Sequence, residues 1–158
     1  MPNNTLLIFG YGNPSRGDDA LGPLLLERLQ AEPSPGVEYL TDFQLQVEHA
    51  LDLEGPDLVL FIDAHLSCKA PFEFAQLQAE SDRSYTTHAM SPAAVLQVYQ
   101  DIKHCPPPPS FMLSVRGEHF ELGEGLSRSA QANLDAALEF AKALCARPDP
   151  AYWRSLDQ

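Results

Sequence analysis

The stretch LLIFGYGNPSRGDDALGPLLLERL, residues 6–29, constrains the fold of this chain most. It opens with an apolar run typical of a buried strand, and then breaks at two glycines, an Asn-Pro pair and two aspartates. Leucines at helical spacing follow, and Pro23 fits only the first turn of such a helix. The segment therefore predicts a strand, a polar turn and a helix, the opening unit of an α/β domain.

The rest of the chain continues this alternation of strands and helices. Apolar runs predict strands at residues 5–9, 37–41, 58–62, 72–77 and 111–115, and helical spacing predicts helices at 20–31, 47–53, 92–103 and 127–145. We predict a single three-layer α/β domain over residues 1–146, with a mostly parallel twisted sheet of about five strands and helices on both faces. Residues 147–158 are predicted to form an irregular C-terminal tail whose aromatic residues dock on the body.

The net charge disfavours some classes of binding partner, and the cysteines indicate the cellular compartment. The formal net charge is −12, which disfavours nucleic acid and anionic membranes as partners because both would repel the surface. Three cysteines without CxxC spacing indicate neither a disulfide framework nor a zinc finger, and fit a reducing compartment. No apolar run is long enough to span a bilayer. No apolar stripe remains that would require burial in a permanent oligomer. We expect a cytoplasmic monomer.

Acidic residues follow two of the predicted strands. Asp18 and Asp19 open the helix after the first strand, where one of them can serve as a cap, and Asp63 closes the apolar run LVLFI. Considered alone, Asp63 is explained equally well by a capped turn and by a functional role. Because ligands in α/β sheets collect at the carboxyl ends of strands, Asp19 and Asp63 should converge there. Two converging carboxylates need a positive centre between them, which favours a metal.

A third ligand must come from the five histidines. His88 lies in the polar stretch YTTHAMSPAAVL ahead of a predicted helix, where the loop edge of the sheet would present it. His65, two residues after Asp63, is its rival, followed by His104 beside Cys105. Two carboxylates and one imidazole suit a borderline divalent ion and leave coordination positions open, as reactive metal sites do.

Other chemistries fit the sequence less well. Ser15 occupies the third glycine position of a dinucleotide-binding GxGxxG pattern, and aspartates at a helix start would repel a pyrophosphate. No GxSxG nucleophile turn is present, and no cysteine has an activating sequence context. A nickel- or nucleotide-binding module without hydrolytic activity, and a scaffold that holds a basic peptide, remain as alternatives.

Three motifs together resemble a known family. GYGNPSRGDDALG, LVLFIDAH and THAMSPAAVL, in this order and spacing, are similar to the hydrogenase maturation proteases, which remove a C-terminal peptide from the large subunit of [NiFe] hydrogenases. The resemblance covers the chain from the first strand to the last helix. It implies an endopeptidase whose partner is the large-subunit precursor, with nickel as the metal, presented by that substrate instead of being permanently bound.

The resemblance also implies roles for individual residues. The acidic, aspartate and histidine metal ligands of the family match Asp19, Asp63 and His88, with Asp18 able to exchange roles with Asp19. Gly12, Asn13 and Arg16 in the polar turn are candidates for substrate binding, with a structural ion pair to Asp18 or another acid as the alternative for Arg16. Gly12 and Asn13 are also expected to shape the turn, since glycine permits positive φ and close backbone approach.

Gln44 is a further candidate for substrate binding. It lies in DFQLQVEHAL, residues 42–51, and another branch of the family has a glycine-rich stretch at this place. Two hydrolytic routes stay open: metal polarisation of the scissile carbonyl with a carboxylate activating water, or an aspartate as general base without direct metal chemistry.

Overall fold

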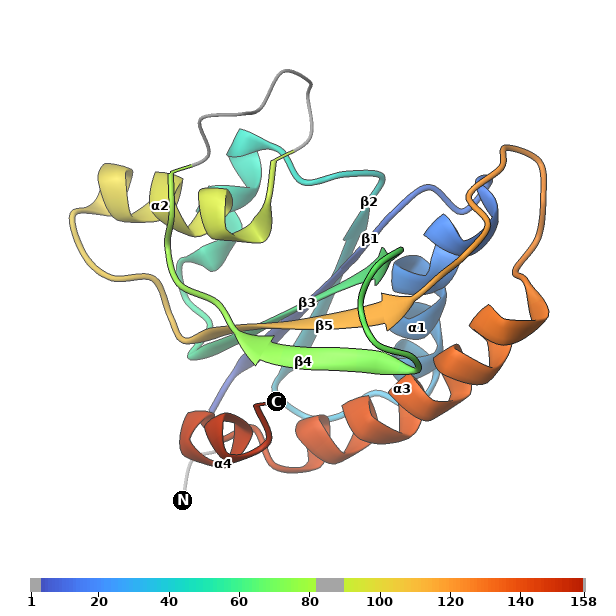
Figure 1. The fold of residues 1–158 in the computed structure, drawn as a ribbon. Helices are drawn as coiled ribbons and strands as arrows, with labels where there is room; N and C mark the ends of the chain where they lie inside the picture. The colour runs from blue at the N-terminus through green and yellow to red at the C-terminus, as the bar shows by residue number, and fades with distance from the viewer. Residues whose placement is uncertain (1–3, 82–89, 158) are drawn as a thin grey trace.

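The computed structural model describes residues 4–81 and 90–157 and confirms the α/β class and its three layers (Figure 1). The strands lie in the order β2 (Val37–Asp42), β1 (Leu6–Tyr11), β3 (Leu58–His65), β5 (Ser110–Arg116) and β4 (Phe72–Gln76). The first four are parallel, and β4 pairs antiparallel with β5 at the edge of the sheet. The mostly parallel five-stranded sheet expected from the sequence is therefore present.

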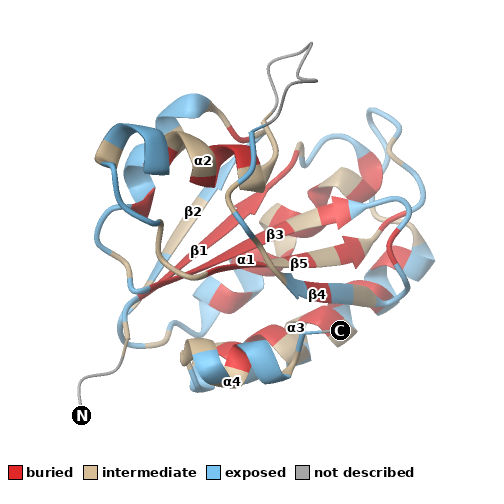
Figure 2. Cartoon of the chain, turned by 60° about the vertical axis from the view of Figure 1, so that its left-hand side comes forward, coloured by how far each residue is buried: buried red, intermediate tan, exposed pale blue. Residues whose placement is uncertain are grey.

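Helices cover both faces of this sheet. They are η1 (Gly17–Ala20), α1 (Leu21–Ala31), η2 (Val47–Leu53), α2 (Pro92–Lys103), α3 (Arg128–Ala146) and α4 (Pro150–Ser155). Leu6 and Ile8 of β1 belong to the core under α1, α3 and α4, whereas Leu7 and Phe9 belong to the core under η2 and α2. The central strands are buried between these two cores, as Figure 2 shows, which explains their continuous apolar sequences.

The element boundaries differ from the predicted ones at functionally relevant places. The predicted helix 20–31 is preceded by the single 3-10 turn η1, and the predicted helix 47–53 is entirely 3-10. β1 and β3 also extend past the predicted ends, to Tyr11 and His65. Asp63 consequently lies inside β3, paired in register with Ser114 of β5, instead of following the strand. Among the described residues, no helix is long and apolar enough to cross a membrane.

The irregular tail predicted after residue 146 is wrong, because α4 forms there and packs into the core. Its Trp153 is fully buried and contacts Phe74 and Phe111 edge-on, at ring-centroid distances of 6.1 and 5.3 Å. The indole N–H donates to the backbone oxygen of Arg147 at 2.8 Å. The expected docking of the tail aromatics is confirmed, but the expected irregular conformation is not. Through Trp153, the tail is part of the domain's core.

We expect Trp153→Ala to lower the free energy of unfolding by about 3–5 kcal/mol, because it removes a large buried ring and leaves a cavity. Urea unfolding followed by circular dichroism measures the change. Tyr152→Ala is the matched control, since this neighbouring ring is only partly buried and stacks on Arg147. Equal losses in the two variants would contradict a core role for Trp153.

Candidate active site at the carboxyl edge of the sheet

The glycine turn after β1 positions Asp19. Gly12 has a φ of 147°, and a Cβ at this position would lie 2.1 Å from the backbone oxygen of Asp19, so only glycine fits. The backbone N–H of Asn13 donates to Asp19 Oδ2 at 2.8 Å, and Asn13 Oδ1 accepts from the N–H of Ser15 at 2.9 Å. Gly12 and Asn13 thus shape the turn that holds the Asp19 carboxylate, as expected from the sequence, and their role in substrate binding stays a prediction.

Asp18 and Asp19 have separate roles in the structure. Asp18 is fully buried and accepts four hydrogen bonds, from the N–H groups of Glu118, His119 and Ser127 and from the Ser127 hydroxyl, at 2.8–3.0 Å. Burial raises the pKa of Asp18, but these hydrogen bonds outweigh it and hold the pKa below its ordinary value. Four donors use the acceptor capacity of one carboxylate. Of the two aspartates, only Asp19 keeps oxygen atoms for a ligand.

Asp19 and Asp63 line one cavity of about 330 Å³. The cavity opens at the carboxyl ends of β1, β2 and β3, beside the start of α2. Its described lining residues are Tyr11, Gly12, Asp19, Phe43, Gln44, Leu45, Asp63, Met90, Ser91 and Pro92. The convergence of the two carboxylates predicted from the strand order is therefore found in the structure.

The environment of the cavity perturbs the pKa of Asp63. Burial and then the negative charge of Asp19 raise the pKa of Asp63 to about 7, against a smaller lowering by the Ala64 N–H at 2.8 Å. Near neutral pH, Asp63 is consequently divided between its protonated and charged forms. A cation between the two carboxylates would remove this penalty, so the pair suits a divalent ion.

The predicted third ligand, His88, lies outside the described residues. Met90 and Ser91, which follow it in the chain, line the cavity, and the Met90 N–H donates to the backbone oxygen of Leu45 at 3.2 Å. Within residues 4–81 and 90–157, no group of three His, Cys, Asp or Glu side chains is placed to hold a metal. The role of His88 stays a prediction.

Three of the other four histidines, His49, His65 and His104, have positions that suit structural roles. His65 is exposed at the end of β3, is not among the cavity residues, and accepts at Nδ1 from the Ser67 N–H at 3.2 Å. His104 adopts left-handed backbone angles as the C-cap of α2. His49 accepts at Nδ1 from the Gln46 N–H, which leaves Nε2 to donate to Asp42 at 3.2 Å. These histidines do not reach the two carboxylates.

Two further residues were predicted to bind substrate. Gln44 lines the cavity, and its role in substrate binding stays a prediction. Arg16 is exposed outside the cavity lining and forms no ion pair with any described residue, so the alternative of a pair with Asp18 is wrong. The sequence did not predict that Tyr11 and Phe43 line the cavity. The one sequence feature that could have indicated it is their position at the carboxyl ends of two strands, with Tyr11 ending β1 and Phe43 following β2.

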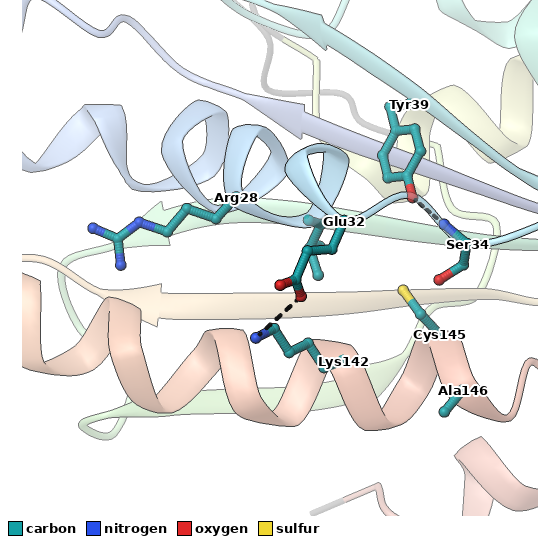
Figure 3. Close-up of a pocket in the computed structure, with 8 residues that line it drawn as sticks. Arg28, Glu32, Ser34, Tyr39, Lys142, Cys145 and Ala146 are labelled. Carbon is teal, nitrogen blue, oxygen red and sulfur yellow. Dashed lines mark hydrogen bonds and ion pairs between the residues drawn. The ribbon is translucent and has the colours of Figure 1, made fainter.

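A second cavity, of about 240 Å³, lies between α1 and α3 and carries no comparable chemistry (Figure 3). Its charges are paired, with Lys142 Nζ 3.7 Å from Glu32 Oε2, and the Tyr39 hydroxyl accepts from the Ser34 N–H. Burial raises the pKa of the Cys145 thiol to about 11, so the thiol is protonated at neutral pH. A thiol in this state is a poor nucleophile.

Comparison with solved structures identifies the fold. The chain is similar to the [NiFe] hydrogenase maturation protease HycI from Thermococcus kodakarensis, with 22% identity and a TM-score of 0.72 over 93% of this chain and 96% of that one. It is also similar to the hydrogenase maturating endopeptidase HybD from E. coli, with 25% identity and a TM-score of 0.69 over 89% and 91% of the two chains. The chain has the fold of the hydrogenase maturation proteases.

This agreement confirms the resemblance that the three sequence motifs indicated. HybD from Thermococcus kodakarensis also matches, with 21% identity and a TM-score of 0.66 over 89% of this chain and 99% of that one. No protein-family model and no curated protein matches the sequence. The similarity to the maturation proteases therefore lies in the arrangement of the whole domain more than in overall sequence identity.

We expect Asp18→Asn to lower the free energy of unfolding by roughly 3 kcal/mol, because an amide nitrogen would face donors and leave buried N–H groups unsatisfied. Asp19→Asn should cost under about 1 kcal/mol, since an amide oxygen still accepts from Asn13. Chemical denaturation of the two variants measures both values. A larger loss for Asp19→Asn would contradict the assigned roles.

We expect Asp63→Asn to change how stability depends on pH. Because the folded-state pKa of Asp63, about 7, lies above its unfolded value, the native state binds the extra proton. As the pH rises from about 4 to 7, the free energy of unfolding of the wild type should fall by roughly 3 kcal/mol relative to that of Asp63→Asn. This follows from about 1.4 kcal/mol per unit of pKa shift. Thermal unfolding of both proteins at several pH values measures this; parallel curves would contradict a raised pKa.

Proposed function

We propose that this protein is an endopeptidase that removes a C-terminal peptide from the nickel-loaded precursor of a [NiFe] hydrogenase large subunit. The observation that carries the proposal is the pair Asp19 and Asp63, which share one cavity at the carboxyl edge of a sheet with the maturation-protease fold. Burial and the charge of Asp19 disfavour the charged form of Asp63, so the cavity fits a ligand that brings a positive centre.

Asp19 and Asp63 would hold the nickel together with His88 as third ligand. The substrate would present the ion, so that docking depends on nickel already inserted in the precursor. When bound, the metal would supply electrostatic stabilisation of negative charge on the scissile carbonyl. Two carboxylates from the enzyme leave coordination positions for ligands from the substrate, which fits a metal shared between the two proteins.

The chain's own residues would handle the proton and the peptide. The pKa of Asp63, about 7 in the metal-free protein, would be lowered by nickel beside it, so that the carboxylate would be charged and able to accept a proton as a general base. One carboxylate would take a proton from the attacking water and return it to the leaving nitrogen. Gln44 would hydrogen-bond the peptide backbone inside the cavity, and the exposed Arg16 would bind a carboxylate of the substrate outside it.

The cellular setting follows from the same proposal. We infer a cytoplasmic location, since the three cysteines are free in the structure and fit a reducing compartment. We also propose a monomer, as expected from the sequence. A nucleotide-binding module is less well supported, because a pyrophosphate in this cavity would meet Asp19 and Asp63. The acidic surface likewise gives no support for a nucleic-acid partner.

A gel-shift cleavage assay tests the proposal with nickel-loaded and nickel-free large-subunit precursors. We expect the wild type to shorten only the loaded precursor, and Asp63→Asn to lose at least about 100-fold in rate as a missing general base would cause. Asp52→Asn is the matched control, because Asp52 is exposed and lines a separate cavity at the other end of the sheet. Full-rate cleavage by Asp63→Asn would overturn the site.

A further inference from the structure

Tyr11 is a polar residue of the cavity that the proposed roles leave unused. It is the last residue of β1, is only 8% exposed, and lines the cavity with Asp19 and Asp63. Its ring packs edge-on against Phe9, with 6.1 Å between the ring centroids. The ring is therefore fixed in the core, while the residue contributes to the wall of the cavity.

The Tyr11 hydroxyl has no protein partner in the described part of the chain. No hydrogen bond joins it to residues 4–81 or 90–157, and it is not a sealed, unsatisfied group, since Arg116 Nε is the buried side-chain atom without a partner among these residues. Burial, and then the charge of Asp63, raise the pKa of Tyr11 well above its ordinary value. The hydroxyl consequently keeps its proton, and can donate a hydrogen bond to an oxygen atom in the cavity.

Two other neutral donors line the cavity. Ser91 is the N-cap of α2, and its hydroxyl oxygen accepts from the Ala94 N–H at 3.1 Å, which does not use its own O–H. Gln44 stands on the segment between β2 and η2, where no strand or helix fixes its backbone. Tyr11 combines a backbone fixed in the sheet, a buried ring and a hydroxyl without a partner in the described structure. Such preorganised donors stabilise charge that develops in a transition state.

We propose that the Tyr11 hydroxyl is a catalytic hydrogen-bond donor to the carbonyl oxygen of the scissile peptide bond, an inference that rests on the proposed function. Water adds to the carbonyl carbon, its proton passes to a carboxylate, and the carbonyl π electrons move to the oxygen that Tyr11 contacts. When those electrons return, the C–N bond breaks and the carboxylate's proton goes to the nitrogen. The products are a carboxyl group and an amine, and Tyr11 keeps its own proton throughout.

The test compares Tyr11→Phe with Tyr99→Phe on the nickel-loaded precursor that the wild type cleaves. Tyr99 is a matched control, because it is equally 8% exposed and belongs to the same core cluster, yet it does not line the cavity. We expect Tyr11→Phe to lower kcat about 100-fold with KM changed less than about threefold, as loss of an oxyanion donor does. Tyr99→Phe should keep wild-type kcat.

Two further measurements separate this role from the alternatives. Thermal unfolding of Tyr11→Phe should match the wild type, because phenylalanine keeps the ring contact with Phe9; a collapse in stability would make the role structural. Calorimetric titration with Ni²⁺ should give the same affinity for both proteins, and a large loss would make Tyr11 part of the metal site. Either result overturns the inference.

The outcomes for the inference and for the proposed function are distinguishable. Wild-type kcat in Tyr11→Phe would overturn the inference and leave the endopeptidase intact. Failure of the wild type to cleave any loaded precursor would overturn the proposed function, and the role of Tyr11 with it.

Discussion

The buried carboxylate of Asp18 is the interaction on which the site depends. Its oxygens accept from residues 118, 119 and 127, and so bind the loop after β5 to the turn after β1. A second connection, from the Gly123 N–H to the Ser15 oxygen at 2.7 Å, joins the same two segments. These contacts fix η1, the single turn that carries Asp19. A residue with a purely structural role therefore sets the position of its functional neighbour.

The site itself is held in an unfavourable electrostatic state by the rest of the fold. Asp63 is partly removed from water within β3 and faces the charge of Asp19, so its charged form is penalised. The penalty persists because strand pairing fixes the backbone there: β1 pairs with β3 up to Ile62, and β5 pairs with Asp63 itself. Packing energy from the two cores thus maintains a pair of acids that would separate in a flexible chain. The penalty on the charged form of Asp63, which comes from burial first and from the charge of Asp19 second, is what a metal-bearing substrate would relieve.

The sequence predicted the architecture well because the apolar patterns of β1, β3 and α2 are strong and unambiguous. It also predicted that Asp19 and Asp63 converge, since strand ends in a parallel sheet meet at one edge. It did not separate Asp18 from Asp19, because the donors to Asp18 lie about a hundred residues away in the chain. The helical tail was missed for a similar reason: Trp153 is ordered by contacts with Phe74 and Phe111, which local sequence does not show.

Close packing of α1 against the sheet connects the scaffold to the chemistry. A Cβ at Gly22 would lie 2.4 Å from the Tyr11 backbone oxygen and 2.8 Å from that of Ile62, so α1 contacts the ends of β1 and β3 directly. Those strand ends carry Tyr11 and, one residue after Ile62, Asp63. The proposed donor and the proposed base are therefore fixed relative to each other by one helix, while Asp19 is fixed by η1 at the start of that helix. Because all three residues depend on the same rigid junction, their geometry can persist without a bound ligand.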